Sequence, residues 1–143
     1  MKKEFSTSWK GSRQPRKQRK YVAQAPSHIK QKMLSSHLSK ELRQKYARRA
    51  FQLRKGDTVK IMNGENAGKS GKIVAIDLNK LKVAIENIQV TKKDGSKANL
   101  YFNPPKLMIT ELNLEDKMRT ESINKTSTKK EIEVKKETKE AKK

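Results

Sequence analysis

The sequence contains no cysteine, few aromatic residues and no long apolar run. The absence of cysteine excludes a disulfide scaffold and a thiolate metal site, and it is typical of a reducing compartment. Because no stretch approaches the roughly 18 apolar residues of a membrane span, we expect none. The N-terminal sequence MKKEFSTSWKGSRQ lacks the apolar segment of a secretory signal, so we expect a cytoplasmic protein.

Acidic residues are also scarce. Of 143 residues, 36 are Lys or Arg and 15 are Asp or Glu, which gives a formal net charge of +21. Residues 1–55 contain 17 of the basic and two of the acidic residues, so this segment alone carries +15. Such a charge repels itself and attracts polyanions. With 32% hydrophobic and 36% charged residues, the chain cannot fill a globule of its length, and we expect a partner to order part of it.

Residues 1–24 are predicted to form a basic, extended arm, because they show neither the helical nor the strand period of apolar residues. Alone the arm should be disordered. Its cations can neutralise phosphates, and its aromatic rings can stack on unpaired bases. A solvated charge run or a localisation signal is the alternative to RNA binding. The candidate RNA contacts of the arm are Trp9, Lys10, Arg13, Arg16, Lys17, Arg19, Lys20 and Tyr21.

Residues 25–50 are predicted to form two short basic helices. Ser39 suits the N-cap of the second helix, in the segment KELRQKYARRA. Leu38, Leu42 and Tyr46 recur at helical spacing, which indicates packing rather than a binding site. The basic residues on the other faces favour phosphate contacts over a merely solvated surface. These candidates are Lys32, Arg43, Arg48 and Arg49.

Residues 51–110 alternate between apolar and polar side chains, which predicts about five or six short strands separated by turns. The dipeptide Asp94-Gly95 between alternating runs is typical of a β-hairpin, and Lys92 and Lys93 beside it are candidate RNA contacts. Several short strands in so few residues favour a small closed β-barrel, since closure removes exposed strand edges. The fold class is therefore mainly β, with the core in this segment.

A glycine-rich segment lies inside the predicted barrel. Four of the six glycines fall between residues 56 and 71, where they let the backbone take positive φ and let another backbone approach closely. The exposed loop would offer amide, side-chain and positively charged donors to phosphates and sugars. Its candidate contacts are Asn63, Gly64, Asn66, Gly68, Lys69, Ser70, Gly71 and Lys72.

The segment 64–70, GENAGKS, is one residue short of the phosphate loop GxxxxGK[ST] of nucleotide hydrolases. Position 63 is Asn where that motif needs Gly, and the following KIVAIDL alternates as a strand where the motif opens a helix. His28 and His37 lie in a basic stretch without the clustered ligands of a zinc site, and we find no nucleophile–base set. We expect no enzyme, no cofactor, no metal and no small-molecule substrate.

The C-terminal segment, residues 111–143, is predicted to contain little fixed structure. Residues 111–120 are expected to form a short helix. Residues 121–143 are a low-complexity mixture of Lys, Glu and Thr, for which a disordered, solubilising tail is the expectation.

Residues 54–80 resemble the KOW motif, a β-hairpin element with a central glycine found in SH3-like barrels. With the segments RQPRKQRKY, SSHLSKELRQKYARRAF and MITELNLEDKMR, they make residues 11–120 similar to the large-subunit ribosomal protein L-twenty-four family, in its archaeal and eukaryotic branch. Bacterial members start close to the KGD turn, so the long basic N-terminal segment points away from bacteria. Ala67 replaces a Lys common in the family, and Asn87 replaces a common Gly, although Asn tolerates positive φ.

The resemblance implies a structural role. Members of that family bind large-subunit rRNA, mainly its 5′ domain, early in assembly, and lie among other large-subunit proteins near the exit of the nascent-chain tunnel. The alternative is a transcription elongation factor of the NusG type, which also contains a KOW barrel. That class carries a separate α/β domain before the barrel, whereas the basic residues that precede it here contain no apolar strands.

Overall fold

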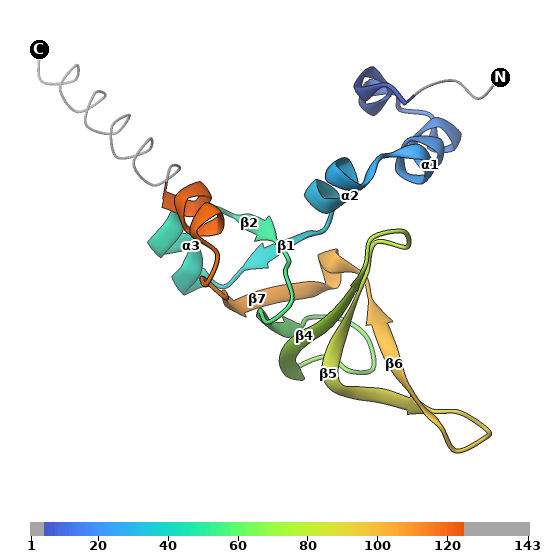
Figure 1. Ribbon diagram of the computed structural model, residues 1–143, viewed down its shortest axis with the longest axis vertical. Helices are drawn as coiled ribbons and strands as arrows, with labels where there is room; N and C mark the ends of the chain where they lie inside the picture. Colours follow the sequence, from blue (N-terminus) through green and yellow to red (C-terminus); the bar gives the residue numbers. More distant parts are fainter. Residues whose placement is uncertain (1–4, 125–143) are drawn as a thin grey trace, which may run out of the picture.

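The computed structural model describes residues 5–124, so most of the predicted tail, 125–143, lies outside the described residues, as do residues 1–4. Within this part, a mainly β fold is confirmed: seven strands form one mixed sheet in the order β2-β1-β7-β3-β4-β5-β6 (Figure 1). The strands are β1 (Ser35–Leu38), β2 (Ala50–Gln52), β3 (Thr58–Ile61), β4 (Ser70–Asp77), β5 (Lys82–Thr91), β6 (Lys97–Phe102) and β7 (Leu107–Glu111).

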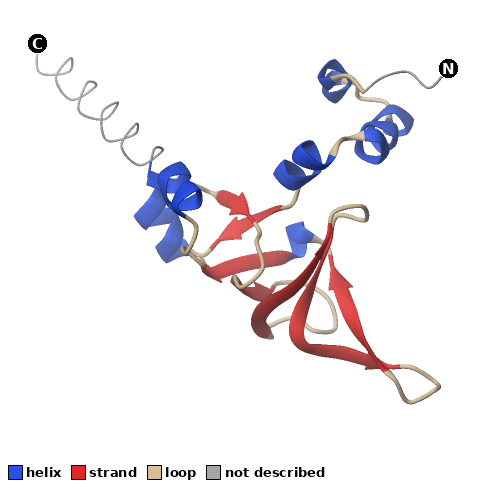
Figure 2. Ribbon diagram, in the orientation of Figure 1, coloured by secondary structure: helices blue, strands red, loops and turns tan. Residues whose placement is uncertain are grey.

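Helices precede, interrupt and follow the strands (Figure 2). They are η1 (Thr7–Gly11), α1 (Pro15–Gln24), α2 (Ser27–Met33), α3 (Lys40–Tyr46) and η2 (Pro104–Lys106), and residues 117–124 are also helical. The sheet curls into a barrel-like shape, but no pairing within the described chain joins β2 to β6. The predicted barrel-like shape is confirmed. The prediction that the barrel is closed was wrong, because the two edge strands do not pair in the described chain.

The core lies on the concave side of the curled sheet. It is built from the alternate residues of each strand, because successive side chains of a strand point to opposite faces. Val59, Val83, Leu107 and Ile109 have no accessible surface. The predicted alternation over residues 51–110 therefore identified the interior of the barrel.

One strand of the sheet comes from residues 25–50 and was missed. β1 pairs antiparallel with β2 and parallel with β7, with Leu38 opposite Ile109. The two predicted helices are present on either side of it, as α2 and α3, and the Ser39 side chain accepts the Leu42 N–H at 3.3 Å as an N-cap. Leu38 and Tyr46 are buried, so their predicted packing role is confirmed, although Leu38 belongs to a strand.

The arm is not extended over residues 15–24, where α1 forms. Pro15 occupies its first turn, a position that suits the fixed φ of proline. Tyr21 is 7% exposed, and its ring centroid lies 5.0 Å from that of Phe5. Figure 1 shows η1 and α1 standing away from the sheet. The helix therefore depends on a contact within the arm, which a search for apolar periodicity along α1 cannot detect.

The C-terminal helix begins later than predicted, at residue 117 instead of 111. It is held to the barrel by Arg119, which is 3% exposed and pairs with the buried Asp57. The Arg119 guanidinium also lies 5.3 Å from the centroid of the Phe51 ring. Ile123, one turn further on, is 1% exposed and joins the main core.

Candidate nucleic-acid interface

The loop 62–69 between β3 and β4 is a compact, exposed turn. Gly64 and Gly68 have φ of +104° and +88°, values that side chains with a Cβ rarely adopt. The Gly68 N–H donates to the Ile61 carbonyl at 2.9 Å, which closes the base of the loop. The Lys69 ammonium donates to the Asn66 side chain at 2.9 Å and faces solvent. The predicted loop is therefore present and largely exposed, with Asn63, Lys69 and Ser70 accessible, whereas several of its backbone N–H groups are used in bonds within the protein.

The loop continues into β4, which contains three of the predicted contacts. Ser70 and Lys72 are exposed, but a Cβ on Gly71 would lie 2.9 Å from Cγ2 of Ile85 and 3.1 Å from the Glu86 carbonyl oxygen. Gly71 therefore serves the close approach of β4 to β5, which accounts for a glycine at this position without any role in RNA binding. Because residues 70–77 are a strand, the helix that a nucleotide-binding phosphate loop requires is absent from this position.

Lys106 lies beside the same loop and was missed. The Met62 N–H donates to its carbonyl at 2.9 Å, which joins η2 to the loop base. Lys106 is exposed and adds a cation next to the loop. It is separated from the glycine-rich segment by two further strands, β5 and β6, so its sequence position gave no signal of this proximity.

The β5–β6 hairpin has the predicted turn at Asp94-Gly95. Gly95 has φ of +80°, and the Asp94 carboxylate accepts hydrogen bonds from the N–H and the hydroxyl of Ser96, at 2.9 and 2.7 Å. These bonds lower the pKa of Asp94. Lys92 and Lys93 are exposed, and Figure 1 shows the hairpin projecting from the sheet. The tip therefore presents two cations to solvent.

The arm presents positive charge that no acidic residue accompanies. Its described residues, 5–24, contain six Lys or Arg and no Asp or Glu, and no Asp or Glu follows before residue 41. Trp9 is half-buried, with the Lys20 ammonium 5.6 Å from its ring centroid. Tyr21, in contrast, is buried against Phe5, so its ring packs within the arm and presents little surface to a base. The remaining arm candidates are exposed: Lys10, Arg13, Arg16, Lys17, Arg19 and Lys20.

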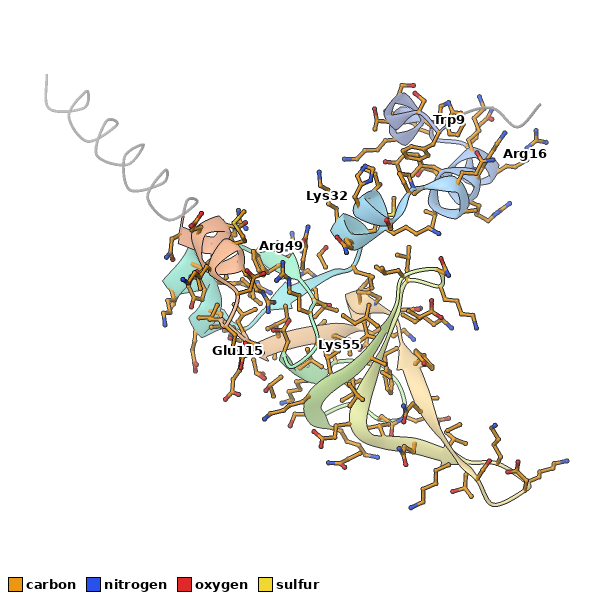
Figure 3. All side chains as sticks on the ribbon, in the orientation of Figure 1. Trp9, Arg16, Lys32, Arg49, Lys55 and Glu115 are labelled. Atoms are coloured by element: carbon orange, nitrogen blue, oxygen red, sulfur yellow. The ribbon has the colours of Figure 1, made fainter. Side chains whose placement is uncertain are left out.

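The candidate RNA contacts on and after α2 differ in whether their side chains already contact other groups of the protein. Lys32 and Arg49 are exposed. The Arg43 side chain donates through Nε to the Leu38 carbonyl at 2.8 Å, and the Arg48 guanidinium lies 5.4 Å from the Phe51 ring centroid. Lys32 belongs to α2, and Arg49 directly precedes β2 (Figure 3).

The described residues form neither a candidate metal site nor a candidate membrane span. Across residues 5–124, no three His, Cys, Asp or Glu side chains lie close enough to share a metal ion. In the same part of the chain, none of the helices has the length and apolar character needed to cross a bilayer.

The family profile and the individual relatives that match this chain point to the same family. The family profile described as "Ribosomal proteins L26 eukaryotic, L24p archaeal" matches residues 12–126. The large ribosomal subunit protein uL24 of Methanoculleus marisnigri is 43% identical over 112 residues, which cover 78% of this chain and 93% of that protein. The uL24 of Methanosphaera stadtmanae is 40% identical over 113 residues, covering 79% of this chain and 97% of that protein. The chain therefore belongs to the ribosomal protein family that comprises eukaryotic L26 and archaeal L24p.

Proposed function

We propose that the chain binds large-subunit rRNA, mainly in its 5′ domain, assists early assembly of the subunit and lies near the exit of the nascent-chain tunnel. Membership of the family makes it a structural, non-enzymatic constituent of the large ribosomal subunit in the cytoplasm. To this the proposal adds the RNA that the chain binds and the position of the chain in the subunit. Other large-subunit ribosomal proteins are the expected protein partners.

The distribution of charge carries the proposal. The nine cations of residues 5–40 are accompanied by no acidic residue, and η1 and α1 stand away from the sheet (Figure 1). Because no acidic residue within this segment neutralises the charge, the arm should attract a surrounding polyanion strongly. If the protein neutralises about 6–10 phosphates, its affinity for RNA should fall about 10³- to 10⁵-fold as the salt concentration rises from roughly 50 to 200 mM.

The loop 62–69 supports the same ligand by a different chemistry. Its exposed side-chain donors suit phosphate and sugar oxygens, and Lys69, Lys72 and Lys106 add charge beside them. Hydrogen bonds at its base attach this loop to the barrel, whereas the arm reaches outward. We therefore infer a folded anchor on the RNA surface and an arm that extends between RNA segments.

The transcription-factor alternative receives no support. In the described chain, the residues before the barrel form short helices and β1, which belongs to the sheet of the barrel itself. They do not form the separate α/β domain of that class.

Two measurements test the proposal. In filter binding at fixed salt, the chain should bind a transcript of the 5′ domain of large-subunit rRNA more tightly than a 3′ transcript of equal length. Equal affinities would contradict the assignment to the 5′ domain. In sucrose-gradient sedimentation of cell extract, the chain should remain with large subunits after a high-salt wash, and migration with RNA polymerase would contradict the ribosomal role.

A further inference from the structure

The arm contains a cavity of about 430 Å³ where η1 meets α1, lined by Ser8, Trp9, Ser12, Lys17 and Lys20. Its lining combines one large aromatic ring, two cations and two hydroxyl-bearing residues. Figure 3 shows Trp9 at the junction of these two helices, away from the barrel. The loop 62–69 and the hairpin tip contribute nothing to it, so it is distinct from the barrel's own candidate contacts.

The cavity is held in shape by contacts within the arm. Gln18 of α1 donates its side-chain amide N–H groups to the carbonyls of Lys10, at 3.1 Å, and of Ser12. These bonds fix the end of η1 against α1. Phe5 packs edge-on against Trp9, with centroids 6.0 Å apart and planes at 72°, and also against the buried Tyr21. Trp9 is therefore positioned by its neighbours before any ligand arrives.

The chemistry of the lining suits a single nucleotide. Trp9 remains half-exposed and offers a surface on which any base can stack, because every base has a π-face. Lys17 and Lys20 are exposed at the rim. The Lys20 ammonium lies over the Trp9 ring, 5.6 Å from its centroid, so a base that stacks on this face must displace it toward the rim. A phosphate held by Lys20 would thus adjoin a base held by Trp9. No acidic residue of the segment 5–40 opposes the phosphate.

We propose that this cavity binds one unpaired nucleotide of RNA, with the base against Trp9 and the phosphate between Lys17 and Lys20. The inference rests on the proposed function and deepens it. The bases of a regular duplex are already stacked and paired, so the cavity selects a bulged or single-stranded nucleotide. The arm then reads RNA structure in addition to supplying charge.

Trp9 is the only tryptophan of the chain, so its fluorescence reports on this cavity alone. We would titrate the full chain with short single-stranded oligoadenylate, and separately with inorganic polyphosphate of equal charge. At saturation, oligoadenylate should quench the Trp9 emission strongly, and polyphosphate, which cannot stack, should quench it much less. Equal quenching by both polyanions, or no quenching by saturating oligoadenylate, would overturn the proposal.

Variants then separate stacking from charge. In fluorescence anisotropy with labelled oligoadenylate, Trp9→Ala should weaken binding about 5- to 150-fold, the usual range for losing one base stack. Trp9→Phe keeps an aromatic ring and should retain most of the affinity, which shows that loss in the alanine variant is not merely disorder of the arm. Wild-type affinity in Trp9→Ala would refute the stacking role.

The two lysines are tested with the tryptophan in place. The double variant Lys17→Gln, Lys20→Gln should require more oligoadenylate for half-maximal quenching. The control Lys80→Gln, Lys97→Gln removes the same charge from exposed positions in the barrel region and should behave as wild type. If both double variants require the same increase in oligoadenylate for half-maximal quenching, the effect arises from net charge alone, and the proposal is contradicted.

Failure of this inference is distinguishable from failure of the proposed function. If the chain binds the 5′-domain transcript with strong salt dependence while Trp9→Ala binds it equally well, only the nucleotide cavity is refuted. If the wild-type chain does not bind the transcript, the proposed function itself is refuted.

Discussion

Arg119 in the C-terminal helix pairs with Asp57 through two parallel hydrogen bonds of 2.7 Å, one from each terminal guanidinium nitrogen. The two side chains are only 2% and 0% exposed. Asp57 also accepts the N–H groups of Arg54 and Asn113, and Arg119 donates to the carbonyls of Gln52 and Asn113. The pair thus joins the entry to β3, the segment after β7 and the C-terminal helix.

Removing one partner of this pair should be costly, because the other charge would stay buried without compensation. We expect Arg119→Met to lower the free energy of unfolding by about 3–5 kcal/mol, measured by urea denaturation. Arg54→Met is the control, since it breaks only the exposed ion pair to Asp116 and should leave the free energy of unfolding nearly unchanged. Similar losses in the two variants would show that the buried pair has no special role.

Gly71 should not tolerate a methyl group. An added Cβ would lie 2.9 Å from Ile85 Cγ2 and 3.1 Å from a backbone oxygen, so the strands must shift to admit it. Overpacking of this kind costs about 1–3 kcal/mol, and thermal denaturation of Gly71→Ala should show the loss. Gly11→Ala is the matched control, because no atom lies within 4 Å of its added Cβ. The two variants should differ clearly, and equal melting temperatures would contradict the close approach.

Gly68 tests backbone strain without crowding. Its φ is +88°, yet its added Cβ would meet nothing within 4 Å. A β-branched residue resists this conformation, so Gly68→Val should lose about 1–3 kcal/mol of stability and also bind rRNA more weakly. Gly68→Asn should lose less, because Asn tolerates positive φ best among residues with a side chain. If the Asn and Val variants lose the same amount of stability, or neither loses any, backbone strain is not the cause.

The tip of the β5–β6 hairpin should show a measurable pH response. Hydrogen bonds from Ser96 hold the pKa of Asp94 below its ordinary value. A lowered pKa favours the folded hairpin above the ordinary pKa, and this contribution disappears as the pH falls through the folded-state pKa. Replacing Ser96 with Ala removes the hydroxyl donor and should raise the pKa of Asp94 in an NMR titration of its carboxyl group. An unchanged pKa would exclude the hydroxyl as the cause.

Local patterns in the sequence predicted the local parts of the fold. Asp94-Gly95 indicated a hairpin, Ser39 an N-cap and the alternation after residue 51 the inward face of the strands; each feature depends on residues close together in the chain. β1 escaped prediction because Ser35–Leu38 is short and rich in polar side chains, and it becomes a strand by pairing with β2 and β7.

Contacts between distant residues account for most of what was missed. Asp57 and Arg119 lie 62 positions apart, so neither the KGD turn nor the C-terminal segment indicated their pairing. α1 has no regular apolar stripe, and its buried face consists chiefly of Tyr21 against Phe5. The candidate site shows the same division. Charge and glycine spacing located the arm and the loop. The packing of Gly71 and Tyr21 depends on Ile85 and Phe5, which no local pattern connects to them.

The salt dependence of rRNA binding tests the central claim, that exposed cations of the arm neutralise RNA phosphates, most directly. We would compare the wild-type chain with the triple variant Arg13→Gln, Arg16→Gln, Lys17→Gln, and with a control that replaces Lys60, Lys80 and Lys97, three exposed barrel-region lysines, by Gln. For the arm variant, the slope of log affinity against log salt should fall in magnitude by roughly 0.7–0.9 for each phosphate that the protein no longer neutralises, while the control keeps the wild-type slope. Indistinguishable slopes for all three proteins would contradict the account.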